Sequence, residues 1–317
     1  MRDTKIFFAT DIHGSDVCLR KFLNAGKFYG VDAVVMGGDI TGKMIVPVVE
    51  EAPDQYAAHL FGRKRVVDST GLAELHKFIA DAGFYAHAMT PDEVASLQQD
   101  PAGVDELFKT LMTETMSRWI DMAEDRLGGT GIEVIFAPGN DDPMFVDDLL
   151  SGSDTVVNPD SRVIELPGGF PMISVGYSNR TPWDSPRELD ENDLRTMIDE
   201  EVAKLEDPNR AIFNLHVPPK NTPIDQAMEL DAEFRPVVKG GSPVIAGVGS
   251  SAVRDAIAAY QPMMSLHGHI HESRGEARIG RTVALNPGSE YSEGVLRGVI
   301  ITLNQKKGLR GYQLVSG

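Results

Sequence analysis

Five short segments of this 317-residue chain contain side chains that can bind metal ions. They are, in chain order, Asp11-Ile12-His13-Gly14, Gly37-Gly38-Asp39, Gly139-Asn140-Asp141-Asp142, His216 and His267-Gly268-His269-Ile270-His271. Their side chains offer carboxylate oxygens, imidazole nitrogens and an amide oxygen. This mixture suits Mn, Fe, Zn, Co or Ni better than it suits Mg or Ca, which prefer all-oxygen sites. The five segments are therefore candidates for one metal site with mixed ligands.

Each segment is a weak signal when it is taken singly. Asp-x-His and Gly-Asp pairs are common by chance, and a single histidine such as His216 is more often a structural residue. The histidine-rich segment at 267–271 could also be a turn with surface histidines. The combination is a much stronger signal, because five independent segments would have to follow predicted strands in this order by coincidence.

Short apolar runs precede these segments, and their length and flanking turn residues predict buried strands. The predicted strands cover residues 5–10, 32–36, 132–137, 172–176, 211–215 and 262–266. A helix predicted at 15–26 joins the first two strands as a βαβ unit. Strands predicted at 283–285, 295–303 and 311–315 suggest an antiparallel finish. Ligands bind at the carboxyl ends of strands in open α/β sheets, so we expect the five segments to converge there.

The segment from about residue 42 to 131 is long for a connection between two strands, and we interpret it as an insertion within a single domain, 1–317. Its first part is expected to form a small hairpin system at 44–49, 56–61 and 65–67. Helices are expected at 72–82, after the capping box that begins at Thr90, and at 104–127. In one interpretation the insertion is simply packed structure. In another, its hairpin at 42–68 is a lid or a dimer contact beside the site. A later helix, predicted at 191–206, has an acidic face that we expect to be solvated.

Composition and charge limit the classes of partner. The net charge of −17, from 30 basic and 47 acidic residues, argues against broad electrostatic binding of nucleic acid or anionic lipid. No apolar run is long enough for a membrane span, and the apolar start at 6–9 is too short for a signal peptide. The single cysteine, Cys18, excludes an intramolecular disulfide and is expected to be a small buried residue of the first helix. We therefore expect a cytoplasmic protein.

At these residues the chain resembles the calcineurin-like metallophosphoesterase superfamily. The superfamily pattern is Asp-x-His, Gly-Asp, Gly-Asn-His with Asp or Glu, a single His and Gly-His-x-His, and the match extends from residue 11 to 271. The segment Asn286-Pro287-Gly288-Ser289 is similar to one branch of small phosphodiesterases. The resemblance implies an α/β fold in the form of a four-layer α/β/β/α sandwich. It also implies hydrolysis of a phosphodiester or phosphomonoester, and we favour the diester.

The resemblance further implies how the ligands are shared between two divalent metal ions, for which we favour manganese. Asp11, His13 and His271 would bind the first ion, Asn140, His216 and His269 the second, and Asp39 both. Two cations about 4 Å apart would lower the pKa of a bridging water and neutralise the phosphoryl oxygens. The hydroxide formed from this water would attack phosphorus in line. Asp39 is therefore one of the expected catalytic residues. The expected substrate is a small molecule with a phosphoester bond.

The chain departs from the superfamily pattern at Asp141, where the pattern has a histidine that is thought to protonate the leaving oxygen. In one interpretation Asp141 only shapes the loop, because aspartate is common in turns. In the other it is catalytic, holds a proton and acts as the general acid. A neighbouring carboxylate raises the pKa of a carboxyl group whereas two dications lower it, so both interpretations stay open. We expect the missing histidine to favour leaving groups that need little protonation.

Other polar residues are weaker candidates for contacts with substrate or for support of the site. The candidate phosphate contacts are Asn140, Lys43, Arg180 with Trp183, and Lys220. Solvation at the surface is the commoner fate of such side chains. His59 could reach the site if the hairpin at 42–68 is a lid. Asp142 is expected to orient a neighbouring ligand or loop, and His267 to be a supporting or structural residue.

Two other functions stay open. The superfamily includes non-catalytic scaffolds that bind proteins, but a scaffold need not keep all seven ligand positions, which are intact here. A metal-dependent nuclease is disfavoured because the largest basic cluster, Arg63-Lys64-Arg65, is too short to bind nucleic acid. The insertion offers a surface for a homodimer. The class of phosphoester is not determined by the sequence.

Overall fold

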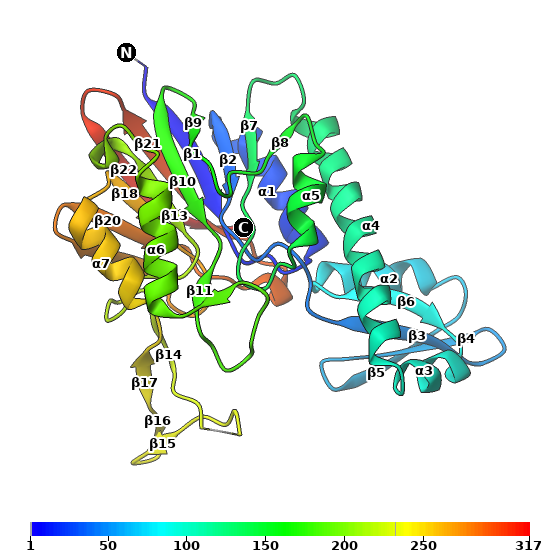
Figure 1. Cartoon of the computed structure of the whole chain (residues 1–317). Helices are drawn as coiled ribbons and strands as arrows, with labels where there is room; N and C mark the ends of the chain where they lie inside the picture. Colours follow the sequence, from blue (N-terminus) through cyan, green and yellow to red (C-terminus); the bar gives the residue numbers. More distant parts are fainter. Residues whose placement is uncertain (1, 232) are drawn as a thin grey trace.

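The computed structural model describes residues 2–231 and 233–317, and two six-stranded sheets form its centre (Figure 1). The first sheet has the order β22-β21-β1-β2-β7-β8. Its strands are β1 Thr4–Ala9, β2 Ala33–Met36, β7 Glu133–Phe136, β8 Val156–Val157, β21 Arg297–Asn304 and β22 Gly308–Ser316. The strands β1, β2, β7 and β8 are parallel, whereas β21 is antiparallel to both of its neighbours.

The second sheet has the order β19-β20-β18-β13-β10-β9. Its strands are β9 Ile164–Leu166, β10 Phe170–Val175, β13 Ile212–Leu215, β18 Met264–Leu266, β19 Gly275–Ile279 and β20 Thr282–Asn286. The four inner strands are parallel and the two edge strands are antiparallel. An antiparallel finish from residue 283 on was expected from the sequence, and for β20 this expectation holds only in part. This strand is antiparallel to β19 but parallel to β18, and it lies in a different sheet from β21 and β22.

Helices cover the outer faces of both sheets, which confirms the predicted four-layer α/β/β/α fold (Figure 1). The first sheet carries α1 Asp16–Tyr29, α4 Pro101–Leu127 and α5 Phe145–Ser151, and the second carries α6 Glu191–Val202 and α7 Ser251–Tyr260. Strand β1 shows how the layers form. Phe7 and Ala9 pack against the helices, whereas Ile6 and Phe8 pack against the second sheet. Side chains of a strand alternate between faces, so an apolar strand can join two cores.

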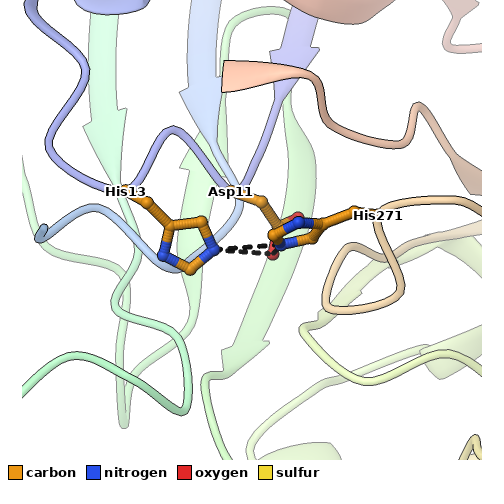
Figure 2. Close-up of side chains that lie close together, drawn as sticks. All are labelled: Asp11, His13 and His271. Atoms are coloured by element: carbon orange, nitrogen blue, oxygen red, sulfur yellow. Dashed lines mark hydrogen bonds and ion pairs between the residues drawn. The ribbon is translucent and has the colours of Figure 1, made fainter. Parts of the chain in front are cut away.

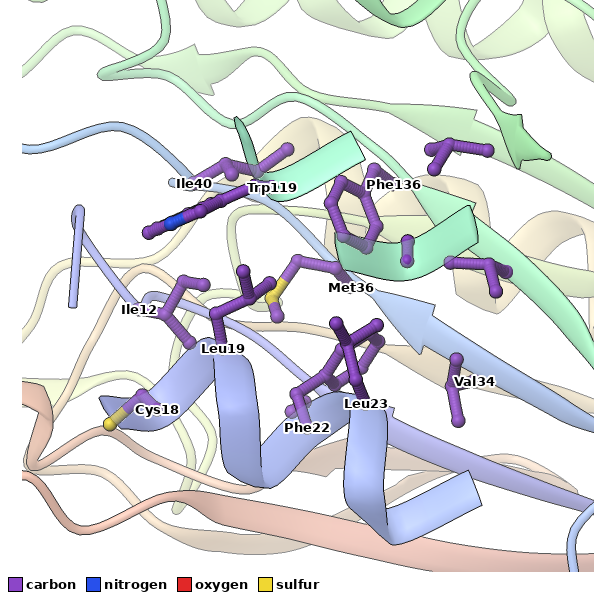
Figure 3. Close-up of a cluster of buried hydrophobic side chains, with 14 of the residues drawn as sticks. Ile12, Cys18, Leu19, Phe22, Leu23, Val34, Met36, Ile40, Trp119 and Phe136 are labelled. Atoms are coloured by element: carbon purple, nitrogen blue, oxygen red, sulfur yellow. The ribbon is translucent and has the colours of Figure 1, made fainter. Parts of the chain in front are cut away.

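A core of buried apolar side chains lies between α1, α4 and the first sheet (Figure 3). Ser15 caps α1 by accepting a hydrogen bond from the Cys18 amide at 3.4 Å, and Gly30 ends the helix with a left-handed φ of 58°. Cys18 is buried as predicted, with 1% of its surface exposed. Trp119 of α4 is fully buried and donates its indole N–H to Asp16 at 2.6 Å. This packing anchors the loop that leads from β1 into α1.

The segment between β2 and β7 contains a four-stranded sheet of order β5-β4-β3-β6. Its elements are β3 Ile45–Ala52, β4 Gln55–Leu60, β5 Arg63–Val67, α2 Leu72–Asp81, β6 Tyr85–Met89 and α3 Pro91–Leu97, followed by α4. The three hairpin strands and the three helices were predicted. Strand β6 was not, because its run is short and it pairs in parallel with β3 across forty residues of chain rather than through a turn. We call residues 45–97 the insertion sheet unit.

A second projection, residues 226–247, was not predicted and is called the arm here (yellow, Figure 1). It consists of two antiparallel pairs, β14 Gln226–Met228 with β17 Ile245–Gly247 and β15 Val238–Lys239 with β16 Ser242–Pro243. Strands of two or three residues are too short to give a periodic apolar signal. The remaining elements are β11 Ser178–Asn179, β12 Glu188–Leu189 and the 3-10 turns Pro208–Arg210 and Tyr291–Glu293. Within the described ranges, no helix combines the length and the apolar character that a membrane crossing requires.

Candidate metal centre

The carboxyl ends of five parallel strands bring the predicted segments to one edge of the two sheets. Asp11 and His13 follow β1, Asp39 follows β2 and Asn140 follows β7, while His216 follows β13 and the remaining two histidines follow β18. Backbone hydrogen bonds join these loops to one another. The amides of Asp11 and His13 donate to the carbonyls of Gly38 at 2.9 Å and Asp39 at 3.0 Å, and Gly268 donates to His216 at 2.8 Å. These backbone hydrogen bonds continue the pairing of the strands and hold the loops in position.

Asp11, His13 and His271 form the first cluster (Figure 2). The Nε2 atoms of His13 and His271 lie 3.0 Å apart, and His271 Nε2 lies 3.4 Å from Asp11 Oδ1. Asp11 and His13 are completely buried, and His271 retains 30% of its side-chain exposure. Two imidazole nitrogens and a carboxylate oxygen thus point at the same small volume.

Asp39, His216 and His269 form the second cluster. His216 Nε2 lies 3.3 Å from Asp39 Oδ2, and His269 Nδ1 lies 2.7 Å from the amide oxygen of Asn140. The backbone amide of His269 also donates to both carboxylate oxygens of Asp11, at 3.0 and 3.1 Å. Asn140 therefore lies beside this cluster, in contact with the His269 ring.

The carboxylate of Asp39 connects the two clusters. Its Oδ2 atom lies 3.6 Å from His13 Nε2 in the first cluster and 3.3 Å from His216 Nε2 in the second. The carboxylate of Asp141 comes within 4.8 Å of ligand atoms of both Asp39 and His13. One oxygen that faces a histidine from each cluster is the arrangement expected of a ligand shared by two ions.

Four of these residues adopt a left-handed backbone that side chains other than glycine rarely take. The φ angles are 55° for Asp11, 40° for His13, 51° for Asp39 and 65° for His269. Each such residue raises the free energy of the folded chain by about 1–2 kcal/mol, and strain of this kind concentrates at functional sites. Glycines beside them permit close approach. A Cβ atom on Gly38 would lie 2.2 Å from His216 Nδ1, and one on Gly268 would lie 2.3 Å from Asp11 Oδ2.

Burial and mutual charge shift the pKa of each ligand. Burial raises the pKa of Asp11, but the hydrogen bond with His271 and the charge of His216 outweigh burial and lower the pKa to about 2. Burial lowers the pKa of His216, yet Asp39 and Asp11 raise it to about 9. Burial, followed by the charge of His216, lowers the pKa of His269 to about 4. The lowered pKa of Asp11 and the raised pKa of His216 both show that the cluster favours positive charge beside its carboxylates.

The donors fit divalent cations in place of such protons. Among buried side-chain atoms of the described residues, His13 Nδ1 and both ring nitrogens of His216 have no hydrogen-bond partner. Unpaired buried nitrogens are costly unless something binds them. The close approach of two Nε2 atoms in the first cluster also requires a proton or a cation between them. Metal ions bind deprotonated ligands and release such protons, and this set of imidazole and carboxylate donors suits first-row divalent ions.

Comparisons with known proteins agree with this architecture. No protein-family model matches the chain. The uncharacterized protein MJ1162 of Methanocaldococcus jannaschii is 30% identical over 159 residues, which are 49% of this chain and 64% of that relative, so less than two thirds of its length is matched. One solved crystal structure aligns over 99% of both chains with 16% identity and a TM-score of 0.56. TT1561 of Thermus thermophilus aligns over 100% of this chain and 99% of that chain, with 12% identity and a TM-score of 0.53.

The chain has the metallophosphoesterase-type fold. At identities of 16% and 12%, the two solved structures show that the fold is shared and say nothing about activity. The resemblance found in the sequence motifs is thus confirmed at the level of the fold, and the roles of individual residues stay predictions.

Two further motif residues brace this metallophosphoesterase fold at the loops that carry the ligands. The Asp142 carboxylate accepts the amides of Ile40 and Thr41, at 3.1 and 2.8 Å to Oδ1, and that of Gly139 at 2.7 Å to Oδ2. It therefore ties the loop after β2 to the loop after β7. His267 is fully buried, and its Nδ1 lies 2.7 Å from the Leu215 carbonyl. Both residues support the loops without pointing into either cluster.

The Asn286-Pro287-Gly288-Ser289 segment also supports the site. The Asn286 amide donates to the carbonyl of Ile270 at 3.0 Å, and the Ser289 hydroxyl donates to the carbonyl of Asp11 at 2.6 Å. Tyr291 follows this segment, and its ring centroid lies 4.8 Å from that of His13. Tyr291 was not predicted, although its position two residues after the segment could have indicated it.

Four weaker candidates lie outside the two clusters. Arg180 is exposed, with its Nε 3.2 Å from Asp190, and Trp183 is 65% exposed, with its ring 6.2 Å from that of Phe234. His59 is exposed on β4, and Lys220 is partly buried in the loop after β13. Their predicted contacts with substrate gain no support from these positions. Lys43, by contrast, reaches the site and forms an ion pair with Asp141.

Two residues without any local sequence signal also reach the loop after β7. The Ser185 hydroxyl donates to Asp141 at 2.6 Å. Arg187 is 1% exposed and donates to the Asp142 carbonyl at 2.8 Å, and its guanidinium also pairs with Asp147 at 2.8 Å. Both belong to the segment between β11 and β12, which no motif marks. Only the fold places this segment beside the ligands.

Proposed function

We propose that this chain is a metal-dependent phosphoesterase that hydrolyses a phosphodiester in preference to a phosphomonoester. The observation that supports it is the position of Asp39, whose Oδ2 faces a histidine of each cluster, at 3.6 and 3.3 Å. A carboxylate placed in this way would hold two cations a few ångströms apart, as phosphoryl transfer with two metals requires. The motif resemblance supports the same activity.

The ligand roles follow the two clusters. Asp11, His13 and His271 would hold one ion, Asn140, His216 and His269 the other, and Asp39 would contact both. When bound, such ions neutralise phosphoryl oxygens and lower the pKa of water. We propose manganese, and any of Fe, Zn, Co or Ni is compatible with the mixed nitrogen and oxygen donors.

The chain itself supplies rigidity and the exclusion of water. Asp11, His13 and Asp39 are at most 2% exposed, so their carboxylates and rings act in surroundings of low polarity where charge interactions are strong. The left-handed backbone at these residues is held by neighbouring loops, so little reorganisation is required when substrate binds. Asn140, which lies between the His269 ring and the Asp141 carboxylate, is the ligand residue that we also propose for contact with the phosphate.

Metal analysis combined with an ester panel tests the proposal. We expect about two metal ions per purified chain and turnover of bis-p-nitrophenyl phosphate by the Mn²⁺-loaded protein. Asp39→Asn should lower kcat/KM at least about 100-fold and reduce the metal content, because a shared ligand is lost. Asp125→Asn, a change of the same kind on the exposed face of α4, should leave both unchanged.

Two outcomes would contradict the proposal. A protein that binds two metals and hydrolyses no member of a panel of diesters and monoesters is not a phosphoesterase. A folded protein that binds no metal would favour the protein-binding scaffold instead. A single domain over 1–317, a homodimer through the insertion, a lid at 42–68 and a cytoplasmic location stay predictions from the sequence.

A further inference from the structure

Lys43 is a partly exposed cation next to the two clusters. It lies four residues after Asp39, and 45% of its side chain is exposed, whereas Asp39 is 2% exposed. Its ammonium group forms an ion pair with the Asp141 carboxylate, which is 17% exposed.

The Asp141 carboxylate has the contacts of an acceptor at both oxygens. Its Oδ1 accepts the Ser185 hydroxyl at 2.6 Å and the Asn140 amide at 2.9 Å, while Oδ2 faces the Lys43 ammonium. The Lys43 ammonium group has donors and no acceptor, so Oδ2 can only accept from it while the pair is formed. The contacts therefore suit an Asp141 that holds Lys43 in place.

The network around Asp141 is rigid and comes from three separate loops. The Asp141 amide donates to Asp39 Oδ1 at 3.0 Å, which fixes the residue against the shared ligand. The Ser185 amide donates to the buried Glu188 carboxylate at 3.1 Å, so the serine is itself held in place. Gly42, next to Lys43, donates its amide to the Tyr85 hydroxyl at 2.8 Å. Both partners of the ion pair are thus anchored.

We propose that Lys43 is a catalytic residue that binds an oxygen of the substrate phosphate, and that Asp141 and Ser185 are positioning residues that aim it. An ammonium group has three N–H donors, so the pair with Asp141 leaves donors for a phosphate. The other cation nearby, Arg187, is 1% exposed and bound to Asp147 and to backbone carbonyls. The inference rests on the proposed function and assigns its phosphate contact.

Two readouts test this proposal in the Mn²⁺-loaded protein, namely turnover of bis-p-nitrophenyl phosphate and binding of inorganic phosphate by calorimetry. Lys43→Met should lower kcat/KM about 100-fold and weaken phosphate binding about 10-fold, with the metal content unchanged. Lys43→Arg keeps the charge and should recover most of both. Lys64→Met is the matched control, because Lys64 is 43% exposed and pairs with Glu51 within the insertion sheet unit.

The positioning role predicts that the effects are not additive. Asp141→Asn should lower kcat/KM about 10-fold, Ser185→Ala should lower it less, and Asp141→Glu should retain most of it. In the Lys43→Met background, Asp141→Asn should cause almost no further loss, because the group it positions is absent.

Three results would overturn the inference. One is a Lys43→Met protein with unchanged phosphate binding and turnover. Another is a further loss from Asp141→Asn in the Lys43→Met background as large as its loss in wild type, which would show that Asp141 acts by itself. The third is a Lys64→Met protein that loses as much turnover and phosphate binding as the Lys43→Met protein. If wild type binds phosphate through Lys43 but hydrolyses no ester, the proposed function fails while the phosphate contact stands.

Discussion

The insertion sheet unit and the arm both project past the carboxyl ends of the central strands, but they are stabilised in different ways (Figure 1). The insertion has its own buried core, formed by Val46, Val48, Ala58, Leu60, Leu75, Ile79 and Ala82. None of the described residues between 226 and 247 is buried, and Met228, Val238 and Ile245 are 46%, 58% and 56% exposed. The insertion can therefore resist local opening, whereas the arm depends on backbone hydrogen bonds that water can replace.

The two projections also differ in their connection to the site. The insertion contacts α1 through the Ser15 hydroxyl, which donates to the Asp81 carbonyl at 2.7 Å, and its Tyr85 accepts the amide next to Lys43. The arm meets the fold at Asp225, a fully buried carboxylate in the loop after β13. A projection with its own core can hold the chain beside Lys43 in place, through the hydrogen bond from Gly42 to Tyr85.

The largest predicted contrast is between two isoleucines, one from each projection. Ile79→Ala removes a fully buried side chain and should lower the free energy of unfolding by about 3 kcal/mol. Ile245→Ala changes a side chain that is 56% exposed and should cost less than about 0.5 kcal/mol. Denaturant titration of both variants measures the difference. Equal losses would show that the arm is packed more tightly than its exposure indicates.

A smaller effect is expected at the base of the arm. Asp225 accepts the amides of Asn221 at 2.8 Å, Thr222 at 2.9 Å and Gly249 at 3.2 Å. Asp225→Ala leaves these buried donors unsatisfied and should cost about 2 kcal/mol. Hydrogen exchange should show faster exchange in the arm, with the insertion unaffected. Faster exchange in both projections would mean that they are coupled, and the contrast in their stabilisation would then fail.

The smallest effect is the response of the insertion to acid. Burial raises the pKa of Asp81, but hydrogen bonds from Lys77 and Arg20 lower it overall. A lowered pKa in the folded state stabilises the protein above the ordinary carboxyl pKa, and this contribution is lost as the pH falls through the lowered value. The difference in the free energy of unfolding between wild type and Asp81→Asn should therefore become smaller as the pH falls from about 5 to about 3. The change should be less than about 1 kcal/mol, because Asp81 and its partners Lys77 and Arg20 are partly exposed. A gap that widens on acidification would contradict this assignment.

Most of the central strands and all seven proposed metal ligands could be predicted from the sequence. Strands such as β1, β2 and β13 are short apolar runs with a polar segment at the carboxyl end, and both signals are local. The topology of parallel strands then places those segments at one edge. The antiparallel assignment for β20 is correct for its pairing with β19 and wrong for its pairing with β18, because strand direction depends on the neighbouring strand and a run of apolar residues does not record it.

The order of the proposed ligands and the departure from the motif at Asp141 can be read directly from the chain. The contacts of Asp141 cannot, because they form only when the chain folds. Its partners Lys43 and Ser185 come from loops after β2 and β11, and their meeting depends on the packing of the two sheets. A local pattern reports what a residue can do chemically. Its charge partners, and so its role, follow from contacts between distant segments, which no window of sequence contains.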